Sequence, residues 1–487
     1  MRYSSAGGRW VIAATVLGSG MASIDATVVG IALPSIGRQF HASLGGLEWV
    51  VTGYLLTLAA WLLIGGALGD RYGRRRVFTV GVAWFTLSSA ACAVAPGTTA
   101  LIVTRALQGA GAALLTPGSL AIIESTFEGE DRGRAIGAWS GLGGVATAAG
   151  PLLGGYLVAA SSWRWIFVIN VPLGALVLWL SARRVPESSD PAAPARLDWG
   201  GGLLAVLGLA GVTYGLIEGT AQGWASAPIL AALAGGVAAL VAFVVVEGRS
   251  PAPMLPLALF RVRRFSVTNL ATFLIYGGLG GVLFLLPVEL QVVDGYTPLE
   301  SGAALLPLTV VMLLLSARSG RLAARIGPRL QMSIGPVVVG LGLALLARST
   351  ADATYGTGVL PAVLVFGLGL AATVAPLTAT ALGALPDEQA GLASAVNNDV
   401  ARAGGLVAVA VLPAIAGITG GAYLHAAELA PGFRTAVLVA GAWCAAAGLL
   451  AAIGLRPSHH PVGGPAEPPA TGRHHCALDA PPMAATP

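Results

Sequence analysis

The sequence contains no lysine among its 487 residues, and it has only 3 cysteines and 6 histidines. Without lysine the chain cannot build the Gly-x-x-x-x-Gly-Lys-Ser/Thr loop that binds ATP phosphates, which excludes ATP hydrolysis of that kind. Cys92, Cys444 and Cys476 lie too far apart in the sequence for a disulfide framework or a zinc site. We therefore expect no metal site, no redox chemistry and no cofactor.

Charged residues are also scarce. They make up 10% of the chain, against about a quarter in soluble domains, whereas 55% of the residues are hydrophobic. The 68 glycines follow no Gly-X-Y period and suit close helix packing in lipid. This composition predicts a membrane protein surrounded by lipid, and nucleic acid is not an expected partner despite the net charge of +5.

Fourteen stretches are long and apolar enough to cross a bilayer core, which needs about 20 helical residues per crossing. The predicted spans are 10–33, 49–69, 77–96, 99–122, 135–160, 165–182, 198–217, 228–246, 266–291, 301–317, 331–347, 358–381, 392–421 and 434–455. The sequence therefore predicts an all-α polytopic membrane protein with fourteen transmembrane helices.

The arginines predict the orientation of these spans. With the N-terminus in the cytosol, 21 arginines fall on the cytosolic side and 4 on the outside, as the positive-inside rule requires. Only Arg105 and Arg402 lie within spans. We expect a multi-pass protein of the cytoplasmic membrane with both termini cytosolic and a disordered Pro-rich tail at 456–487.

An internal repeat predicts the architecture. The segments Gly66–Arg76 and Gly320–Arg329 share Gly, Leu, Arg, Gly and Arg at identical offsets, 254 residues apart. Two six-helix bundles follow, at 1–182 and 265–455. Between them, 183–264 would supply cytosolic linkers and an inserted transmembrane hairpin at about 198–246. Parallel halves of this kind are typical of transporters whose substrate site lies between them.

Four further segments accompany the loop motif Gly66–Arg76. They are Ile24–Pro34, Arg105–Gly111, Gly150–Gly155 and Trp163–Gly174. Together the five segments resemble the motifs of the major facilitator superfamily, and within it the fourteen-span drug:proton antiporters. The resemblance runs from about residue 10 to residue 455. It implies the fold of that superfamily and a monomeric carrier driven by the proton gradient.

Two charged residues within the spans are candidates for proton coupling. Asp25 lies deep in the first span, where an ionised carboxylate costs about 2.5–3.5 kcal/mol and desolvation favours the protonated form. Arg105 shares a helix face with Gln108, and we expect it to reach the cavity and bias proton binding at Asp25. The alternatives are an Asp25 that only pins helices together and an Arg105 that only contacts helix carbonyls.

The resemblance also implies a cytosolic latch of charges and helix dipoles that holds the outward-facing state. Its residues are Gly66, Leu68, Asp70, Arg71, Gly73, Arg74 and Arg75. A plain positive-inside anchor would explain the arginines but not Asp70. Ala324 stands at the position of Asp70 in the second copy, so the second loop departs from the pattern.

Small residues recur along one face of the fifth span. The antiporter motif there comprises Gly141, Gly150, Pro151, Gly154 and Gly155. Such a seam predicts close helix contact, with a kink at Pro151. The resemblance suggests that the seam controls bending during alternating access, and ordinary packing is the simpler interpretation.

The remaining candidates would line a substrate cavity. They are Gln108, Tyr54, Trp61, Trp139, Phe273, Tyr276, Glu289, Asn398 and Arg402. Most aromatic residues in membrane proteins serve packing or the interface, and Glu289 would either bind a cationic substrate or reach interfacial water. Asn398 and Arg402 would line the cavity or reach the cytosolic boundary.

The leading interpretation is a proton antiporter that exports small hydrophobic or cationic drugs or antibiotics by alternating access. An importer, or a carrier for a single endogenous metabolite, could use the same fold. An enzyme is not expected, because all six histidines lie outside the spans. A sensor is not expected either, because no soluble domain is long enough to signal.

Overall fold

The computed structural model describes residues 1–190, 198–250, 253–348, 354–386 and 389–455. Within these ranges fourteen helices are long and apolar enough to cross a membrane, which confirms the predicted number of spans. The predicted tail at 456–487 lies outside the described residues.

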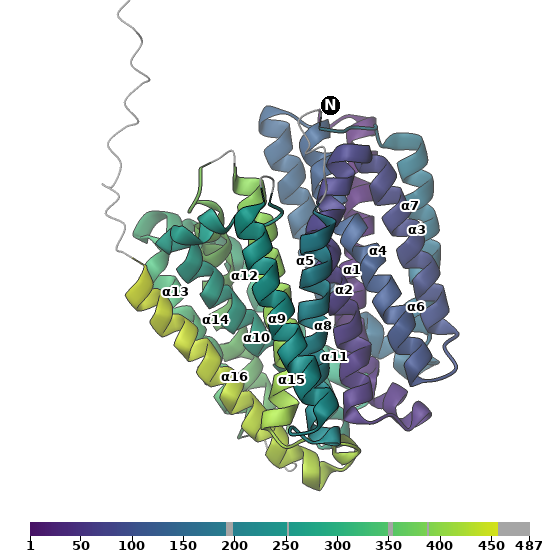
Figure 1. Ribbon diagram of the computed structural model, residues 1–487, viewed down its shortest axis with the longest axis vertical. Helices are drawn as coiled ribbons and strands as arrows, with labels where there is room; N and C mark the ends of the chain where they lie inside the picture. The colour runs from purple at the N-terminus through teal and green to yellow at the C-terminus, as the bar shows by residue number, and fades with distance from the viewer. Residues whose placement is uncertain (191–197, 251–252, 349–353, 387–388, 456–487) are drawn as a thin grey trace, which may run out of the picture.

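Two of the fourteen spans are interrupted, so they appear as helix pairs α6–α7 and α11–α12 (Figure 1). The helices are α1 (Ala6–Phe40), α2 (Leu44–Tyr72), α3 (Arg74–Ala93), α4 (Thr98–Thr126), α5 (Gly129–Ala160), α6 (Trp165–Val168), α7 (Asn170–Arg184), α8 (Trp199–Gln222), α9 (Ala227–Arg249), α10 (Arg263–Val292), α11 (Pro298–Ala303), α12 (Leu306–Ile326), α13 (Pro328–Leu346), α14 (Val359–Leu382), α15 (Ala390–Ile415) and α16 (Ala426–Gly454). Two short 3-10 turns, η1 (Leu257–Arg261) and η3 (Ala422–Leu424), precede α10 and α16.

The helices pack in two groups, α1 to α7 and α10 to α16, seen on the right and left of Figure 1. We call these groups the N-half and the C-half. The internal repeat is visible in the backbone, because α2 and α12 end one residue before Gly73 and Gly327, which are 254 residues apart. Both glycines adopt positive φ, +110° and +82°, a region that residues with a Cβ rarely enter.

The repeated motif is therefore mostly helical rather than a loop. Residues 66–72 form the last turns of α2, and 320–326 form the last turns of α12. A single glycine then turns the chain into the next helix, and Pro328 begins α13 at a position where its missing N–H is not needed. The sequence placed residues 70–72 and 320–326 outside the predicted spans 49–69 and 301–317, because their arginines end the apolar run.

The two halves touch at the membrane face opposite the N-terminus. There α5 packs against α11, where a Cβ on Gly155 would lie 2.5 Å from the carbonyl oxygen of Pro298. Gln291 Nε2 donates a 2.9 Å hydrogen bond from the end of α10 to the Ile31 carbonyl of α1. Tyr423 Oη likewise donates to the Ala42 carbonyl at 2.7 Å. These contacts close the assembly on that face.

The hairpin α8–α9 lies between the halves in sequence and contacts both of them through α8, which packs on α2 and α15 (Figure 1). Trp49 Nε1 of α2 donates to Glu218 Oε1 of α8 at 3.1 Å. The two hairpin helices approach closely at glycines, and a Cβ on Gly236 would lie 2.6 Å from the Val212 backbone nitrogen. Small residues therefore set the spacing of the hairpin, as lipid-embedded packing requires.

Neighbouring glycines of α9 offer a matched test of this packing. Gly236→Ala would place a methyl group against the α8 backbone, so we expect the free energy of unfolding to fall by about 1–3 kcal/mol. Gly235 has no atom within 4 Å of an added Cβ, so Gly235→Ala should leave stability unchanged or slightly raised. SDS titration in mixed micelles measures both, and equal effects would contradict the packing assignment.

Candidate functional site

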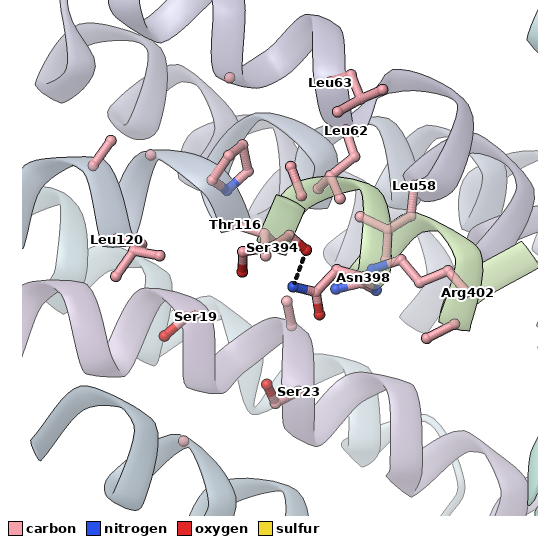
Figure 2. Close-up of a pocket in the computed structure, with 18 of the residues that line it drawn as sticks. Ser19, Ser23, Leu58, Leu62, Leu63, Thr116, Leu120, Ser394, Asn398 and Arg402 are labelled. Carbon is pink, nitrogen blue, oxygen red and sulfur yellow. Dashed lines mark hydrogen bonds between the residues drawn. The ribbon is translucent and has the colours of Figure 1, made fainter. Parts of the chain in front are cut away.

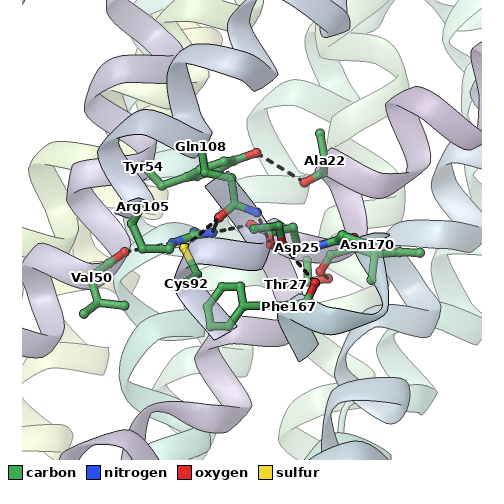
Figure 3. A network of polar contacts seen from close by, with 12 residues as sticks. Ala22, Asp25, Thr27, Val50, Tyr54, Cys92, Arg105, Gln108, Phe167 and Asn170 are labelled. Carbon is green, nitrogen blue, oxygen red and sulfur yellow. Dashed lines mark hydrogen bonds and ion pairs between the residues drawn. The ribbon is translucent and has the colours of Figure 1, made fainter. Parts of the chain in front are cut away.

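A buried ion pair lies inside the N-half. Asp25 of α1 has no exposed surface, and Arg105 of α4 is 1% exposed. Arg105 Nη1 donates to Asp25 Oδ2, and Gln108 Nε2 donates to Asp25 Oδ1 at 2.9 Å (Figure 3). Asn170 Nδ2, at the start of α7, adds a third contact at 3.3 Å. All three donors point at the carboxylate oxygens, as the burial of a charged group requires.

The guanidinium of Arg105 is equally well surrounded. Its Nε donates to the Val50 carbonyl of α2 at 3.2 Å, and Nη1 also donates to Gln108 Oε1 at 2.7 Å. The guanidinium carbon lies 4.2 Å from the ring centre of Tyr54 and 5.8 Å from that of Phe167 (Figure 3). A buried arginine needs such partners, because it does not lose its proton.

The sequence identified Asp25, Arg105 and Gln108 as candidate site residues but gave no role to Asn170. Asn170 is 1% exposed and also donates to Ser89 Oγ at 3.0 Å, so it links α7 to α3 and to the ion pair. The available signal was a polar amide within an otherwise apolar span.

A cavity of about 930 Å³ lies between the two halves, beside this network. Parts of α1, α2, α4, α5, α10 and α15 form its walls, some of whose side chains Figure 2 shows. The lining residues Asp70, Arg74 and Glu124 place one end of the cavity near the helix ends on the face that carries the N-terminus. Five of the nine predicted cavity residues line it: Tyr54, Trp139, Tyr276, Asn398 and Arg402.

The structure places the other four candidates elsewhere. Gln108 points into the ion-pair network, and Trp61 packs against Trp199 of the hairpin, with ring centres 6.2 Å apart. Phe273 and Glu289 lie on α10 but are not among the lining residues, and Glu289 is 8% exposed. Arg105 does not reach the cavity either, because its side chain is enclosed within the N-half.

Tyr54 forms the boundary between the cavity and the ion pair. It lines the cavity, while Arg105 lies against its ring and its hydroxyl donates to the Ala22 carbonyl at 3.4 Å. Ala26 and Thr27, the residues after Asp25, also line the cavity. Asp25 therefore lies behind a single layer of residues that line the cavity.

The predicted latch residues sit at the cavity mouth. Asp70 and Arg74 form an ion pair of 2.8 Å, and both line the cavity together with Gly66. The Arg75 backbone N–H donates to Glu187 Oε1 at 3.0 Å, and Glu187 Oε2 lies 3.5 Å from Arg75 Nε.

Glu187, in the segment after α7, was missed from the sequence because it is far from the motif along the chain. A Cβ on Gly73 would lie 2.8 Å from Glu187 Oε1, so only a glycine here leaves room for the carboxylate. Leu68 is half-buried, and Arg71 lies over the Tyr72 ring at 5.2 Å. In the second copy Arg329 donates instead to the Ala452 carbonyl of α16, at 3.0 and 2.6 Å.

The antiporter-motif residues of α5 divide into two groups. Gly150 and Gly154 lie against α1, while Pro151 and Gly155 lie against α11 of the C-half. By contrast, an added Cβ on Gly141 would meet no atom within 4 Å. The small-residue face is thus packed at the closed side of the membrane and open toward the N-terminal side.

Residues 15–410 match the family described as Major Facilitator Superfamily. The chain belongs to the major facilitator superfamily. It is a multi-pass membrane transporter, not an enzyme, as the sequence predicted.

Several relatives have names that describe resistance. This superfamily member is 37% identical to the multidrug resistance protein Stp of Mycobacterium tuberculosis over 407 residues, which cover 82% of this chain and 74% of the relative. It is 38% identical to the tetracenomycin C resistance and export protein of Streptomyces glaucescens over 404 residues, with 82% and 74% coverage. The puromycin resistance protein pur8 of Streptomyces alboniger is 37% identical over 414 residues, with 82% and 80% coverage.

Solved transporters share the fold at low sequence identity. A bacterial homologue of the human lysosomal transporter Spinster, inward-facing and unoccupied, has a TM-score of 0.65 at 17% identity and covers 93% of this chain and 97% of its own. A D-xylose-proton symporter has a TM-score of 0.64 at 17% identity, with 92% and 98% coverage. At this identity the likeness establishes the fold alone.

A double-mutant cycle tests the buried pair. Asp25→Asn alone leaves Arg105 buried without a counter-charge, so we expect a loss of about 3–5 kcal/mol in unfolding free energy. Arg105→Met alone should also destabilise, whereas the double variant should lose less than the sum of the two single losses. SDS titration in mixed micelles provides the measurement, and strictly additive losses would show that the two charges are not coupled.

Proposed function

We propose that this transporter exports small hydrophobic molecules across the cytoplasmic membrane in exchange for protons. The observation that carries the proposal is the ion pair of Asp25 and Arg105, which is enclosed within the N-half beside a cavity that Tyr54, Ala26 and Thr27 line. A titratable group in that position can respond to what occupies the cavity. The names of the relatives, which describe antibiotic resistance and export, support drugs or antibiotics as the cargo.

The arginine distribution assigns the face that carries the N-terminus to the cytosol. Both chain ends are then cytosolic, and the cavity is open to the cytosol and closed toward the outside. This is the conformation in which an exporter loads its cargo. The sealed contact between α5 and α11 is the one that must open for release.

Proton binding at Asp25 supplies a physical reason for the conformational change. A proton neutralises the carboxylate and leaves Arg105 buried without a counter-charge, which costs about 3–5 kcal/mol if nothing moves. Moving one charge through the membrane potential yields about 2.3 kcal/mol per 100 mV, before any contribution from a pH difference. The two energies are of similar size, so one proton can drive the rearrangement, and no cofactor is required.

The two groups of small residues on α5 suggest how the halves rock. In this state Pro151 and Gly155 lie against α11, whereas Gly137 and Gly141 face open space. Rocking about the middle of α5 would release the first pair and bring the second pair against the C-half. The latch at Asp70 and Arg74 would then meet the C-half on the cytosolic side.

Proton exchange in inside-out vesicles tests the proposal. Vesicles containing the wild type are acidified inside, and tetracenomycin C, puromycin or ethidium is added outside while a pH-sensitive dye reports the gradient. At least one compound should discharge the gradient with the wild type and fail to do so with Asp25→Asn, because Asp25 carries the exchanged proton.

The matched control is Glu130→Gln, which removes a carboxylate whose side chain is 82% exposed on the α5 surface. This variant should retain full exchange. Labelled puromycin that still moves down its own gradient, with no discharge by any compound, would replace the antiporter with an uncoupled carrier. In inside-out vesicles, export appears as accumulation of the compound in the lumen. If no compound accumulates there, the result would favour an importer.

A further inference from the structure

The charges that line the cavity are unevenly placed along its depth. Asp70 lies two residues before the end of α2, and Glu124 lies two residues before the end of α4. Asp198 precedes the first residue of α8, and Arg74 is the first residue of α3. All four therefore sit at the cytosolic mouth. Among the described residues that line the cavity, Arg402 is the only charged one in the middle of a spanning helix.

Arg402 lies in the middle of α15, twelve residues after its first residue. At 1.5 Å per residue this is about 18 Å along the helix axis. Figure 2 shows its side chain extending along the cavity wall toward Asn398, near Leu58. The long side chain thus brings a fixed positive charge to the deep part of the cavity.

Among the described residues Arg402 forms no hydrogen bond or ion pair, and its Nε is buried without an acceptor. Asp399, three residues earlier, interacts electrostatically with Arg402, but it does not line the cavity and no ion pair within 4 Å joins the two side chains. The Asn398 amide donates a 2.9 Å hydrogen bond to the Ser394 carbonyl, as Figure 2 shows, and no hydrogen bond joins it to the Arg402 guanidinium among the described residues. An arginine within a span that forms no hydrogen bond or close ion pair among the described residues is unusual, because charged residues within the membrane normally pair or face a pathway.

We propose that Arg402 binds an anionic group of the cargo, a carboxylate or a phenolate, and that the carrier therefore favours anionic over cationic compounds. This inference rests on the proposed export function and replaces the expectation of cationic cargo from the sequence. A guanidinium presents parallel N–H donors that match a carboxylate, which gives geometric selection as well as attraction.

The surroundings of Arg402 define the rest of the ligand. Leu58, Leu62 and Leu279 line the cavity, and Tyr54 and Trp139 add aromatic surface. The Trp139 indole Nε1 also has no acceptor among the described residues. The site therefore fits a planar hydrophobic body that carries hydrogen-bond acceptors and one negative charge.

The charge of the cargo also changes how strongly the membrane potential drives transport. Exchange of one entering proton for a neutral molecule moves one positive charge inward. Exchange of one proton for one departing anion moves the equivalent of two, so the potential contributes twice as much per cycle. An anion site in the cavity thus makes export steeper in its response to voltage.

Three probes with one aromatic body test the proposal: 1-pyrenecarboxylate, 1-pyrenemethanol and 1-pyrenemethylammonium. The full chain is placed in lipid nanodiscs, and binding is measured by energy transfer from tryptophan to pyrene, with empty nanodiscs subtracted. The wild type should bind the carboxylate most tightly and the ammonium most weakly. Arg402→Gln should weaken carboxylate binding on the order of ten- to a hundredfold and leave the alcohol nearly unchanged.

A second variant keeps the size of the site and cancels its charge. Asn398→Asp places a carboxylate one helical turn before Arg402, where the two can pair. It should reduce carboxylate binding and raise ammonium binding. Asp399→Asn removes a carboxylate of α15 that does not line the cavity but interacts electrostatically with Arg402, so it should keep or strengthen the carboxylate preference.

Retained binding of the alcohol shows that a variant is folded. The proposal is overturned if the wild type binds the carboxylate no better than the ammonium, or if Arg402→Gln leaves the preference intact. Either result leaves proton exchange through Asp25 standing. Conversely, a carboxylate preference that depends on Arg402, found in a protein whose Asp25→Asn variant still exchanges protons, would remove the proposed coupling and keep the anion site.

Discussion

The central constraint in this molecule is the burial of opposite charges in a helix bundle that lies in lipid. Asp25 and Arg105 tolerate that environment only because neighbouring helices supply every remaining partner. α1 and α4 carry the charges, α2 provides a carbonyl and an aromatic ring, and α7 provides an amide. The N-half is therefore held together by a network that includes one carboxyl group, and in the proposed exchange the proton would act on this packing.

The cavity and the network share a wall, so in the proposed exchange cargo and proton would influence each other over a short distance. Tyr54 contacts Arg105 with its ring while lining the cavity. In the proposed exchange, a cargo molecule in contact with Tyr54 would change the packing around the Arg105 guanidinium, and a movement of that guanidinium would change the cavity wall. The closed contact between α5 and α11 completes the arrangement, because it leaves only one side of the membrane in communication with that wall.

Much of the fold could be predicted from the sequence, because apolar runs and the 254-residue repeat depend on local composition alone. The pairing of Asp25 with Arg105 was also within reach, since two charges in lipid need partners. The direction in which each side chain points could not be predicted from the sequence. Helical periodicity identifies a face of a helix but not which neighbour that face meets, so Gln108 and Trp61 were assigned to the cavity although they face the ion pair and the hairpin. Glu187 escaped notice because its partners lie more than a hundred residues away along the chain.

The shared position of Tyr54 limits how the transporter can change its range of cargo. A smaller residue there would enlarge the cavity for a bulkier antibiotic, but it would also let water reach the buried charges and allow protons to pass without cargo. Substitutions on the opposite wall, along α10 and α15, carry no such penalty. Under the proposed proton exchange, a change in the range of cargo is therefore expected to alter the C-half wall while Tyr54 is retained, since a proton leak would dissipate the gradient that drives export.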